Sequence, residues 1–500
     1  MKPFGTRGVA AFSALALSSL ALVACTATPG ASSSTAGTTL TITANAISGG
    51  KNAAEADWVD QFIIPKFVEA QAAAGTTVSV KFEPQGVDDE NYKTKIALDL
   101  QSGKGADIIA IDGIWTGEFA QAGYIKPLNE VGGAAVDAWS GWKQIPEAVQ
   151  ASISFEGKNY GVPQGTDGRV LYYNKTLFKQ AGLSPEWAPT SWDDILSAAR
   201  ALKKLDGVTP IQLNAGTAMG EATTMQGMLP LLVGTGEPVW KDGKWIGNTQ
   251  GMRDVLNLYK TIYVDEKLGD DVLQQEAAGR DTSFSEFAAG KIGILAEGDY
   301  FWRSVINPAE GVGTAPMKDR DTAVGYVKIP AKVAGSGVDG RSFVSMSGGA
   351  GRVLNPNTKN AELAWKLLEF MNSPEAFEAR AAGTLSISPR DDVNKALLAK
   401  DPMLTYVNAE VLPITSYRPG LAEYTAVSTA LQQASLDVVT GTAPDEAIKT
   451  YVSALTGIVG ADKITQGLAK GWPRRATARA SAACTLPTSR DSPSISSLKI

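Results

Sequence analysis

Carboxylate side chains occur at the ends of apolar segments in this chain. Asp112 follows the apolar segment 106–111, Glu297 and Asp299 follow the segment 292–295, and Asp167 precedes a tyrosine-rich stretch. Two carboxylic acids about 5 to 9 Å apart can act as acid and nucleophile on a glycosidic bond. The sequence alone does not fix the separation of these groups, so hydrolysis of carbohydrate stays one open alternative.

Several other chemistries are excluded by composition. The chain has no histidine, and its two cysteines are Cys25 and Cys484. A Ser-His-Asp or Cys-His nucleophile therefore cannot form, and neither can a His or Cys metal cluster within one chain. No P-loop, dinucleotide fingerprint or Gly-x-Ser-x-Gly motif occurs. We expect neither a cofactor nor a metal.

The segments that must position these residues alternate between strand and helix patterns. Apolar or alternating strands are predicted at 40–43, 78–82, 106–111 and 292–295, with helices between them, as at 91–101. The nearly continuous apolar strands are typical of a sheet covered on both faces. The sequence therefore predicts an α/β architecture.

Length and charge limit the organisation further. The 500 residues, 44% of them hydrophobic, exceed what one core usually covers, so two globular units are expected. The net charge is −6, which argues against a nucleic-acid partner.

The two ends of the chain differ from its body. Residues 1–24 combine a basic start with an apolar run, as a secretory signal peptide does. Residues 25–39 are rich in Thr, Ala, Ser and Gly and predict a flexible tether before a folded body that begins near residue 40. Residues 472–500 show no periodicity and predict a disordered tail.

The sequence Leu22-Val23-Ala24-Cys25 resembles the lipobox of bacterial lipoproteins. The resemblance implies that Cys25 carries a lipid and that the protein is held at the extracellular face of the bacterial cell membrane. Several acyl chains on one cysteine give stable attachment.

Five segments, taken in their order along the chain, resemble segments of the extracellular sugar-binding proteins of ABC transporters, the family of the maltose-binding protein. The resemblance covers roughly residues 40–469. It rests on the segments 106–128, 160–175, 287–302, 347–356 and 418–427.

This resemblance implies a two-lobed periplasmic-binding-protein fold of type II. Each lobe would be a mixed sheet flanked by helices, and a hinge would join them. The N-terminal lobe is expected to comprise 40–152 plus 346–380, and the C-terminal lobe 153–345 plus 381–471.

The same resemblance, with the rule that ligands bind beyond the carboxyl ends of strands, indicates a set of sugar-contacting residues. Aromatic rings cover a sugar's apolar face, and planar polar groups bond its hydroxyls. The candidates are Asn52, Asp112, Trp115, Gln164, Asp167, Arg169, Asp299, Tyr300, Trp302, Gly349, Arg418 and Tyr424.

Structural roles compete with ligand contact at several of these positions. Asp112 can cap a helix, Asp167 and Arg169 can form a hinge ion pair, and Tyr300 and Trp302 can fill a core.

A monomer that delivers a sugar to membrane permease subunits is the expected function. The alternatives are a binding protein for a polyamine, an oxoanion or chelated iron, and the enzyme considered above.

Overall fold

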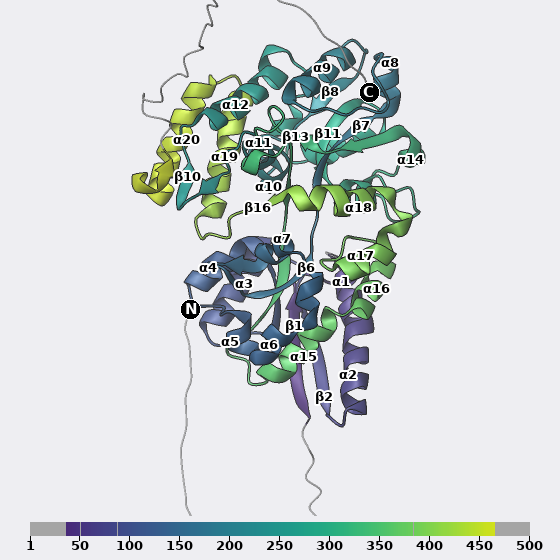
Figure 1. Cartoon of the computed structure of the whole chain (residues 1–500), viewed down its shortest axis with the longest axis vertical. Helices are drawn as coiled ribbons and strands as arrows, with labels where there is room; N and C mark the ends of the chain where they lie inside the picture. Colours follow the sequence, from purple (N-terminus) through teal and green to yellow (C-terminus); the bar gives the residue numbers. More distant parts are fainter. Residues whose placement is uncertain (1–36, 51, 88, 384, 466–500) are drawn as a thin grey trace, which may run out of the picture.

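The computed structural model describes residues 37–465 except 51, 88 and 384 (Figure 1). Two α/β lobes lie one above the other and are joined by several chain segments. The predicted signal peptide, Cys25, most of the predicted tether and the 472–500 tail lie outside the described residues.

The first lobe is built on a five-stranded mixed sheet. Its central strand pairs are parallel between β1 and β2 and between β1 and β3, whereas β15 runs antiparallel to both of its neighbours. Across the sheet the order is β2 (Val78–Pro84), β1 (Thr38–Ala44), β3 (Ile108–Asp112), β15 (Ala350–Leu354) and β6 (Gly161–Gly165).

Helices cover this sheet and bury its apolar side chains. Leu40, Ile42 and Ile108 from the strands pack with Phe67 and Trp365 from the helices in one core. The helices are α1 (Ala53–Trp58), α2 (Ile64–Ala73), α3 (Asp89–Gln101), α4 (Thr116–Gln121), α5 (Leu128–Gly132), α6 (Ala134–Ala138), α7 (Glu147–Gln150), α15 (Ala361–Met371), α16 (Pro374–Gly383) and α17 (Asp391–Leu397), and the hairpin β4 (Ser154–Phe155) and β5 (Lys158–Asn159) lies among them.

The second lobe contains a four-stranded sheet and two smaller ones. The main order is β12 (Val324–Val327), β7 (Arg169–Asn174), β11 (Ile292–Gly298) and β8 (Thr209–Gln212). The smaller sheets are β13 (Ile329–Pro330), β14 (Phe343–Ser347) and β16 (Thr415–Tyr417), and β17 (Ile464–Thr465), β10 (Lys244–Ile246) and β9 (Trp240–Lys241).

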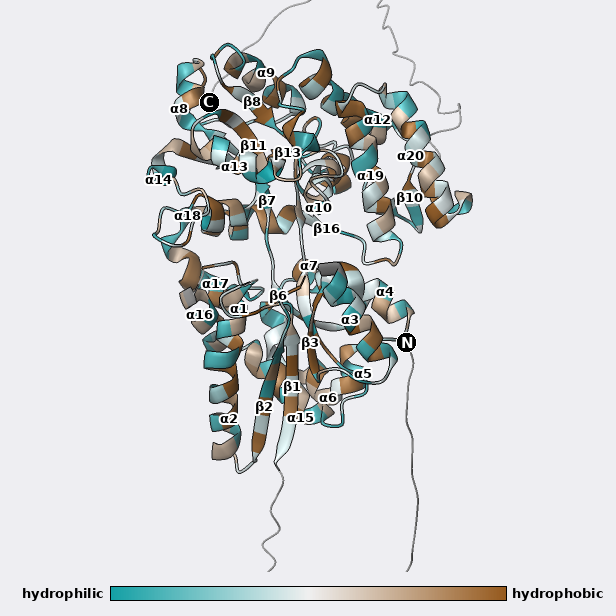
Figure 2. Ribbon diagram, turned by 180° about the vertical axis from the view of Figure 1, so that it is seen from behind, coloured by the Kyte–Doolittle hydropathy of each residue, from teal (hydrophilic) through white to brown (hydrophobic). Residues whose placement is uncertain are grey.

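Helices flank the second lobe's main sheet. Figure 2 shows hydrophilic and hydrophobic residues mixed on α20 of this lobe, as on α2 of the first lobe, which is expected for helices with one buried face. The helices of this lobe are α8 (Lys175–Gln180), α9 (Trp192–Leu202), α10 (Glu221–Thr223), α11 (Leu229–Gly234), α12 (Gln250–Tyr259), α13 (Gly279–Ala288), α14 (Arg320–Ala323), α18 (Pro402–Tyr406), α19 (Tyr424–Val439) and α20 (Pro444–Val459).

Local sequence signals place several helix ends. The Ser191 hydroxyl accepts a hydrogen bond from the Asp194 amide at 3.2 Å and caps α9. Gly290 follows α13 with a φ of 72°, a conformation that favours glycine, and β11 begins two residues later. The strand predicted at 292–295 is confirmed.

The chain crosses between the lobes at three places. β6 leads into β7 near residues 165–169, β14 leads into β15 near 347–350, and α17 leads into α18. β6 pairs with β15 in the first sheet, so the chain leaves the first lobe after residue 165, later than the expected boundary at 152. No sequence pattern marks this boundary, because β6 is a five-residue segment that either sheet could accept.

None of the helices among the described residues is long and apolar enough to span a membrane.

Candidate functional site

A cavity of about 620 Å³ lies between the lobes, beside the first two of the three crossings, those near residues 165–169 and 347–350. Its wall comes from the carboxyl ends of β1 and β3, the start of α1, both crossings and a few residues of the second lobe. The polar and aromatic lining residues are Asn45, Asn52, Glu55, Tyr92, Asp112, Trp115, Gln164, Thr166, Asp167, Arg303, Arg380, Ser386 and Arg418.

Asp112 and Trp115 stand at the end of β3. The Asp112 carboxylate accepts hydrogen bonds from the Ile114 amide at 3.1 Å and from Arg418 at 3.0 Å, both on Oδ1. Trp115 is largely buried between Tyr92 and Phe119, with ring centroids about 6 Å away. The strand end therefore offers a fixed carboxylate beside an aromatic cluster.

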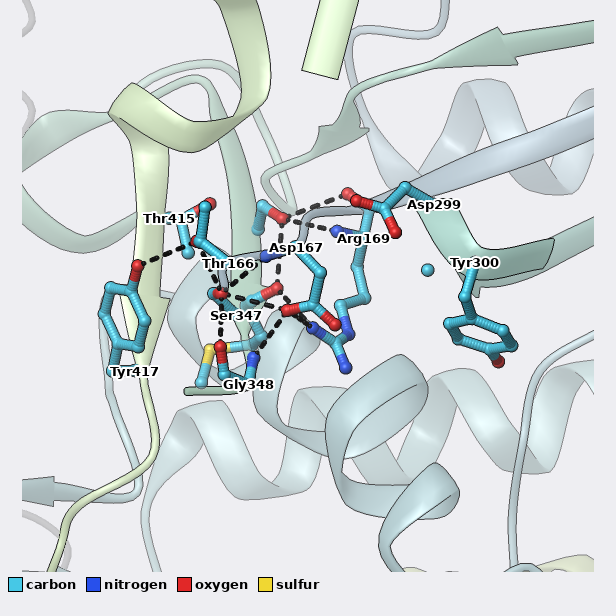
Figure 3. A network of polar contacts seen from close by, with 12 residues as sticks. Thr166, Asp167, Arg169, Asp299, Tyr300, Ser347, Gly348, Thr415 and Tyr417 are labelled. Carbon is cyan, nitrogen blue, oxygen red and sulfur yellow. Dashed lines mark hydrogen bonds and ion pairs between the residues drawn. The ribbon is translucent and has the colours of Figure 1, made fainter. Parts of the chain in front are cut away.

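A polar network holds the first and second crossings together (Figure 3). Asp167 Oδ1 accepts hydrogen bonds from Arg169 at 2.5 Å, from the Ser347 hydroxyl at 2.9 Å and from the Gly348 amide at 2.8 Å. The Thr166 hydroxyl lies 3.2 Å from that of Ser347. These bonds join the first crossing to the second beside the cavity.

An ion cluster forms another part of the wall. The Glu55 carboxylate is bound by Arg352 and by Arg380, the latter at 2.6 Å. Burial raises the pKa of Glu55, but the two guanidinium groups outweigh it, so the pKa lies below its usual value. Both arginine groups lie about 5 Å from the Trp58 ring centroid. Glu55 is therefore an ionised, fixed hydrogen-bond acceptor at the cavity.

The second lobe contributes Arg303, whose Nε lies 3.3 Å from Asp299 Oδ1. Asp299 is only 1% exposed, and burial raises its pKa to about 6. Arg303 and Arg169 lower that pKa, and Asp167 raises it. The charge of this pair therefore changes near pH 6.

The structure brings seven of the twelve predicted residues to the cavity wall. They come from both crossings, the β3 end, the start of α1 and the loop after β16. They are Asn52, Asp112, Trp115, Gln164, Asp167, Gly349 and Arg418.

Five predicted residues do not belong to the described cavity wall. Arg169 is ion-paired with Asp167 and Asp299 with Arg303, while the Tyr300 hydroxyl donates a hydrogen bond to Glu297. Trp302 is buried against Arg320 and donates to Asp401 at 3.2 Å, and Tyr424 is fully buried. The contacts just described join these five side chains to other residues of the protein. Tyr300, Trp302 and Tyr424 therefore do not line the cavity as the sequence analysis expected.

Sequence reasoning missed Glu55, Tyr92, Arg303 and Arg380. Each lies on a helix or helical turn that reaches the cavity only through long-range packing. No spacing in the sequence distinguishes them from charged surface residues. Among the described residues, no group of three or more His, Cys, Asp or Glu side chains could hold a metal ion.

This geometry, a cavity between two α/β lobes with crossing strands, agrees with what related sequences show. Residues 60–376 match the family of bacterial extracellular solute-binding proteins, which is more than half of the chain. The chain belongs to this family. It is accordingly a solute-binding protein and not an enzyme.

Relatives with known names are distant. A binding protein of Brucella abortus (strain 2308) is 26% identical over 278 residues, which are 55% of this chain and 61% of that protein's length. The maltooligosaccharide ABC transporter solute-binding lipoprotein of Streptococcus pneumoniae (R6) is 24% identical, with 76% of this chain and 80% of that protein covered.

A solved structure has the same fold. T. maritima MalE3 with bound maltose superposes with a TM-score of 0.65 at 20% identity, covering 84% of this chain and all of that one. The two-lobed periplasmic-binding-protein fold expected from the sequence is confirmed.

Proposed function

We propose that this protein captures a carbohydrate reversibly in the interlobe cavity and delivers it to the permease of an ABC importer. The observation that carries the proposal is the pairing of charges around the cavity. Three carboxylates line it, and each is bound by at least one arginine: Glu55 by Arg380, Asp112 by Arg418, and Asp167 by Arg169.

Such a wall suits an uncharged polyol better than an ion. A polyamine would need an unpaired carboxylate, and an oxoanion would need an unpaired cation, because a buried ligand charge must be compensated. Carboxylate–guanidinium pairs still offer spare lone pairs and N–H groups to sugar hydroxyls. Trp115 and Tyr92 also line the cavity, where they are 7% and 2% exposed, and offer a small aromatic surface to the apolar face of a sugar ring.

The similarity to a maltooligosaccharide-binding lipoprotein supports the same ligand class. We propose that the seven predicted residues of the wall, together with Glu55, Arg303 and Arg380, contact the sugar. Closure of the lobes would bring the second-lobe residues toward it.

A thermal-shift and calorimetric screen tests the ligand class. Maltotriose, chitobiose, spermidine and sulfate are compared on the purified protein. A sugar at 100 times its dissociation constant should raise the free energy of unfolding by about 2.7 kcal/mol. Stabilisation by spermidine or sulfate with none by any sugar would refute the proposal.

A matched pair of variants localises the binding. Asp112→Asn alters the cavity wall, whereas Asp137→Asn alters an exposed carboxylate bonded to Asn129 on the first lobe. Only the first change should weaken sugar binding.

Lipid attachment at Cys25, a monomeric state and delivery to a permease are further parts of the proposal. The lipobox-like sequence before Cys25 supports attachment. Membrane fractionation of cells producing the parent protein or Cys25→Ser tests it. The parent should be in the membrane fraction and the variant should be released; equal distribution of the two would contradict the anchor.

A further inference from the structure

The loop between β16 and α19 belongs to the second lobe, yet it contacts the first. It holds Arg418, Pro419, Gly420 and Leu421. We define residues 418–421 as the strap. β16 pairs with β14 and α19 packs on α12 and α20, so both ends of the strap are fixed in the second lobe.

The Arg418 guanidinium joins the two lobes. Its Nη2 donates to Asp112 Oδ1 at 3.0 Å in the first lobe, and its Nη1 donates to Glu221 Oε2 at 3.3 Å in the second. The Arg418 side chain is only 8% exposed. Breaking either pair therefore leaves a largely buried charge with less compensation.

Glu221 is itself held firmly, so it is a fixed end of this bridge. The Tyr424 hydroxyl donates to Glu221 at 3.1 Å, Thr224 donates at 3.0 Å, and Ser428 donates to the other carboxylate oxygen. These three donors all come from the second lobe. This use of Tyr424 explains why a residue predicted at the cleft lies wholly inside the lobe.

Backbone packing adds a second contact across the lobes. Gly117 of α4 lies so close to Gly420 that a Cβ atom on Gly117 would come within 1.3 Å of the Gly420 carbonyl oxygen. No residue with a side chain fits there without displacing the strap. The strap and α4 are therefore in direct backbone contact.

The Asp112 carboxylate is oriented by these contacts. Its Oδ1 accepts both the Ile114 amide and Arg418, while its Oδ2 accepts no hydrogen bond from the described residues. The Asp112 side chain is 37% exposed and lines the cavity. The free oxygen is thus available to a ligand hydroxyl in a fixed position.

We propose that Arg418 is a positioning residue that fastens the lobes beside the cavity and holds Asp112 ready for the ligand. It is a noncovalent tie in addition to the three chain crossings. The ligand part of this proposal rests on the proposed function, but the interlobe tie does not.

Spin labels measure the tie without any ligand. Leu98 on α3 and Val333 in the second lobe are exposed, so Leu98→Cys and Val333→Cys carry the labels, with Cys25 and Cys484 changed to serine. Arg418→Gln should broaden the distance distribution between labels and lengthen its mean. Arg418→Lys, which keeps a charge but not the two-armed geometry, should restore part of the parent distribution.

The matched control is Arg200→Gln. Arg200 binds Glu266 through two hydrogen bonds of 2.6 and 2.7 Å within the second lobe, and neither residue lines the cavity. The substitution should therefore leave the distances unchanged. An unchanged distribution in Arg418→Gln would overturn the tie.

If Arg418→Gln does not fold, the same spin-label measurement is made on Asp112→Asn, a substitution that removes only the first-lobe end of the bridge. It too should broaden the distribution, and parent-like distances would overturn the tie.

The positioning role is measured separately with maltotriose. Arg418→Gln should bind it roughly tenfold more weakly, with partial rescue in Arg418→Lys. Unchanged affinity in Arg418→Gln would overturn the positioning role. If the parent protein binds no maltotriose or chitobiose, the proposed function fails, whereas the distance result still decides the tie.

Discussion

Two strand ends in this molecule carry the same kinds of residue and use them differently. β3 ends in Asp112 and is followed by Trp115; β11 is followed by Asp299, Tyr300 and Trp302. The Asp112 side chain is 37% exposed and lines the cavity, whereas Asp299 is 1% exposed. An acidic residue and aromatic residues after an apolar strand therefore do not suffice to make a ligand site.

The segment that follows each strand explains the difference. After β3 a short 3₁₀ turn, Gly113–Trp115, keeps Asp112 at the sheet edge as its capping residue. After β11 a π-helical turn, Phe301–Val305, begins at once and turns Phe301 and Trp302 into a core with Tyr172. The path of the chain after each strand therefore decides which residues line the cavity.

The largest effect expected from this contrast is that of Trp302→Ala. Removing a buried tryptophan should lower the free energy of unfolding by about 3 to 5 kcal/mol, while maltotriose affinity of the folded protein stays within about twofold. Denaturant unfolding followed by circular dichroism measures the loss. Trp240→Ala, at a 38% exposed hairpin position, is the control and should cost less than about 0.5 kcal/mol. A small loss at Trp302 would mean that its core is loosely packed.

Substitution of the two aspartates separates the strand ends by function. Asp112→Asn removes a charged acceptor from the cavity wall and should weaken maltotriose binding by about 1.5 to 3 kcal/mol, roughly 10- to 150-fold. Asp299→Asn should change affinity less than about threefold. Isothermal titration calorimetry measures both, and equal losses would remove the distinction between the strand ends.

The acidity of Asp299 gives a pH test. Its folded pKa of about 6 exceeds the unfolded value of about 3.9, so the folded state binds the proton more tightly. Stability contributed by this group is greatest below about pH 4 and falls as pH rises through about 6. Asp299→Asn should therefore be more stable than the parent at pH 8, by on the order of 2 kcal/mol, and the gain should vanish near pH 4.

Unfolding midpoints at pH 4, 6 and 8 measure this effect. A destabilised Asp299→Asn at pH 8 would show that the ion pair with Arg303 outweighs the cost of burying the carboxylate.

The smallest effect is expected for Tyr300→Phe. The Tyr300 hydroxyl donates to Glu297, which also accepts two hydrogen bonds from Arg280. Glu297 also accepts hydrogen bonds from Asn214 at 3.1 Å and from the Gly298 amide at 3.3 Å. Losing one of these five hydrogen bonds should cost about 1 kcal/mol of stability and leave sugar affinity unchanged. A loss of affinity here, measured by calorimetry, would place Tyr300 at the ligand after all.

Much of the fold could be predicted because its signals are local. The apolar strand segments, such as 292–295, depend on a few neighbouring residues, and so do the Ser191 cap and the Gly290 helix end that the structure contains. The position of Asp112 at the cavity could also be predicted from the sequence, since the carboxyl end of a strand in an α/β sheet lies at the edge where ligands bind.

The rest of the site depends on distant packing. Choosing Tyr300 and Trp302 as ligand candidates, and not Phe301 between them, treats this segment as a strand, in which alternate residues point the same way. In the helical turn that actually follows, residues two apart do not share a face. Arg303 and Arg380 reach the cavity because whole helices pack there, and no local pattern records that.

The place of β15 in the first sheet has a consequence for the order in which the protein can fold during synthesis. β15 lies between β3 and β6, so residues 350–354 must be inserted between strands made long before. Until the ribosome has produced them, the facing edges of β3 and β6 have no partner in this sheet. Such a late insertion gives slow, nonlocal folding and leaves the nascent chain exposed to aggregation for longer than a lobe made from one continuous stretch.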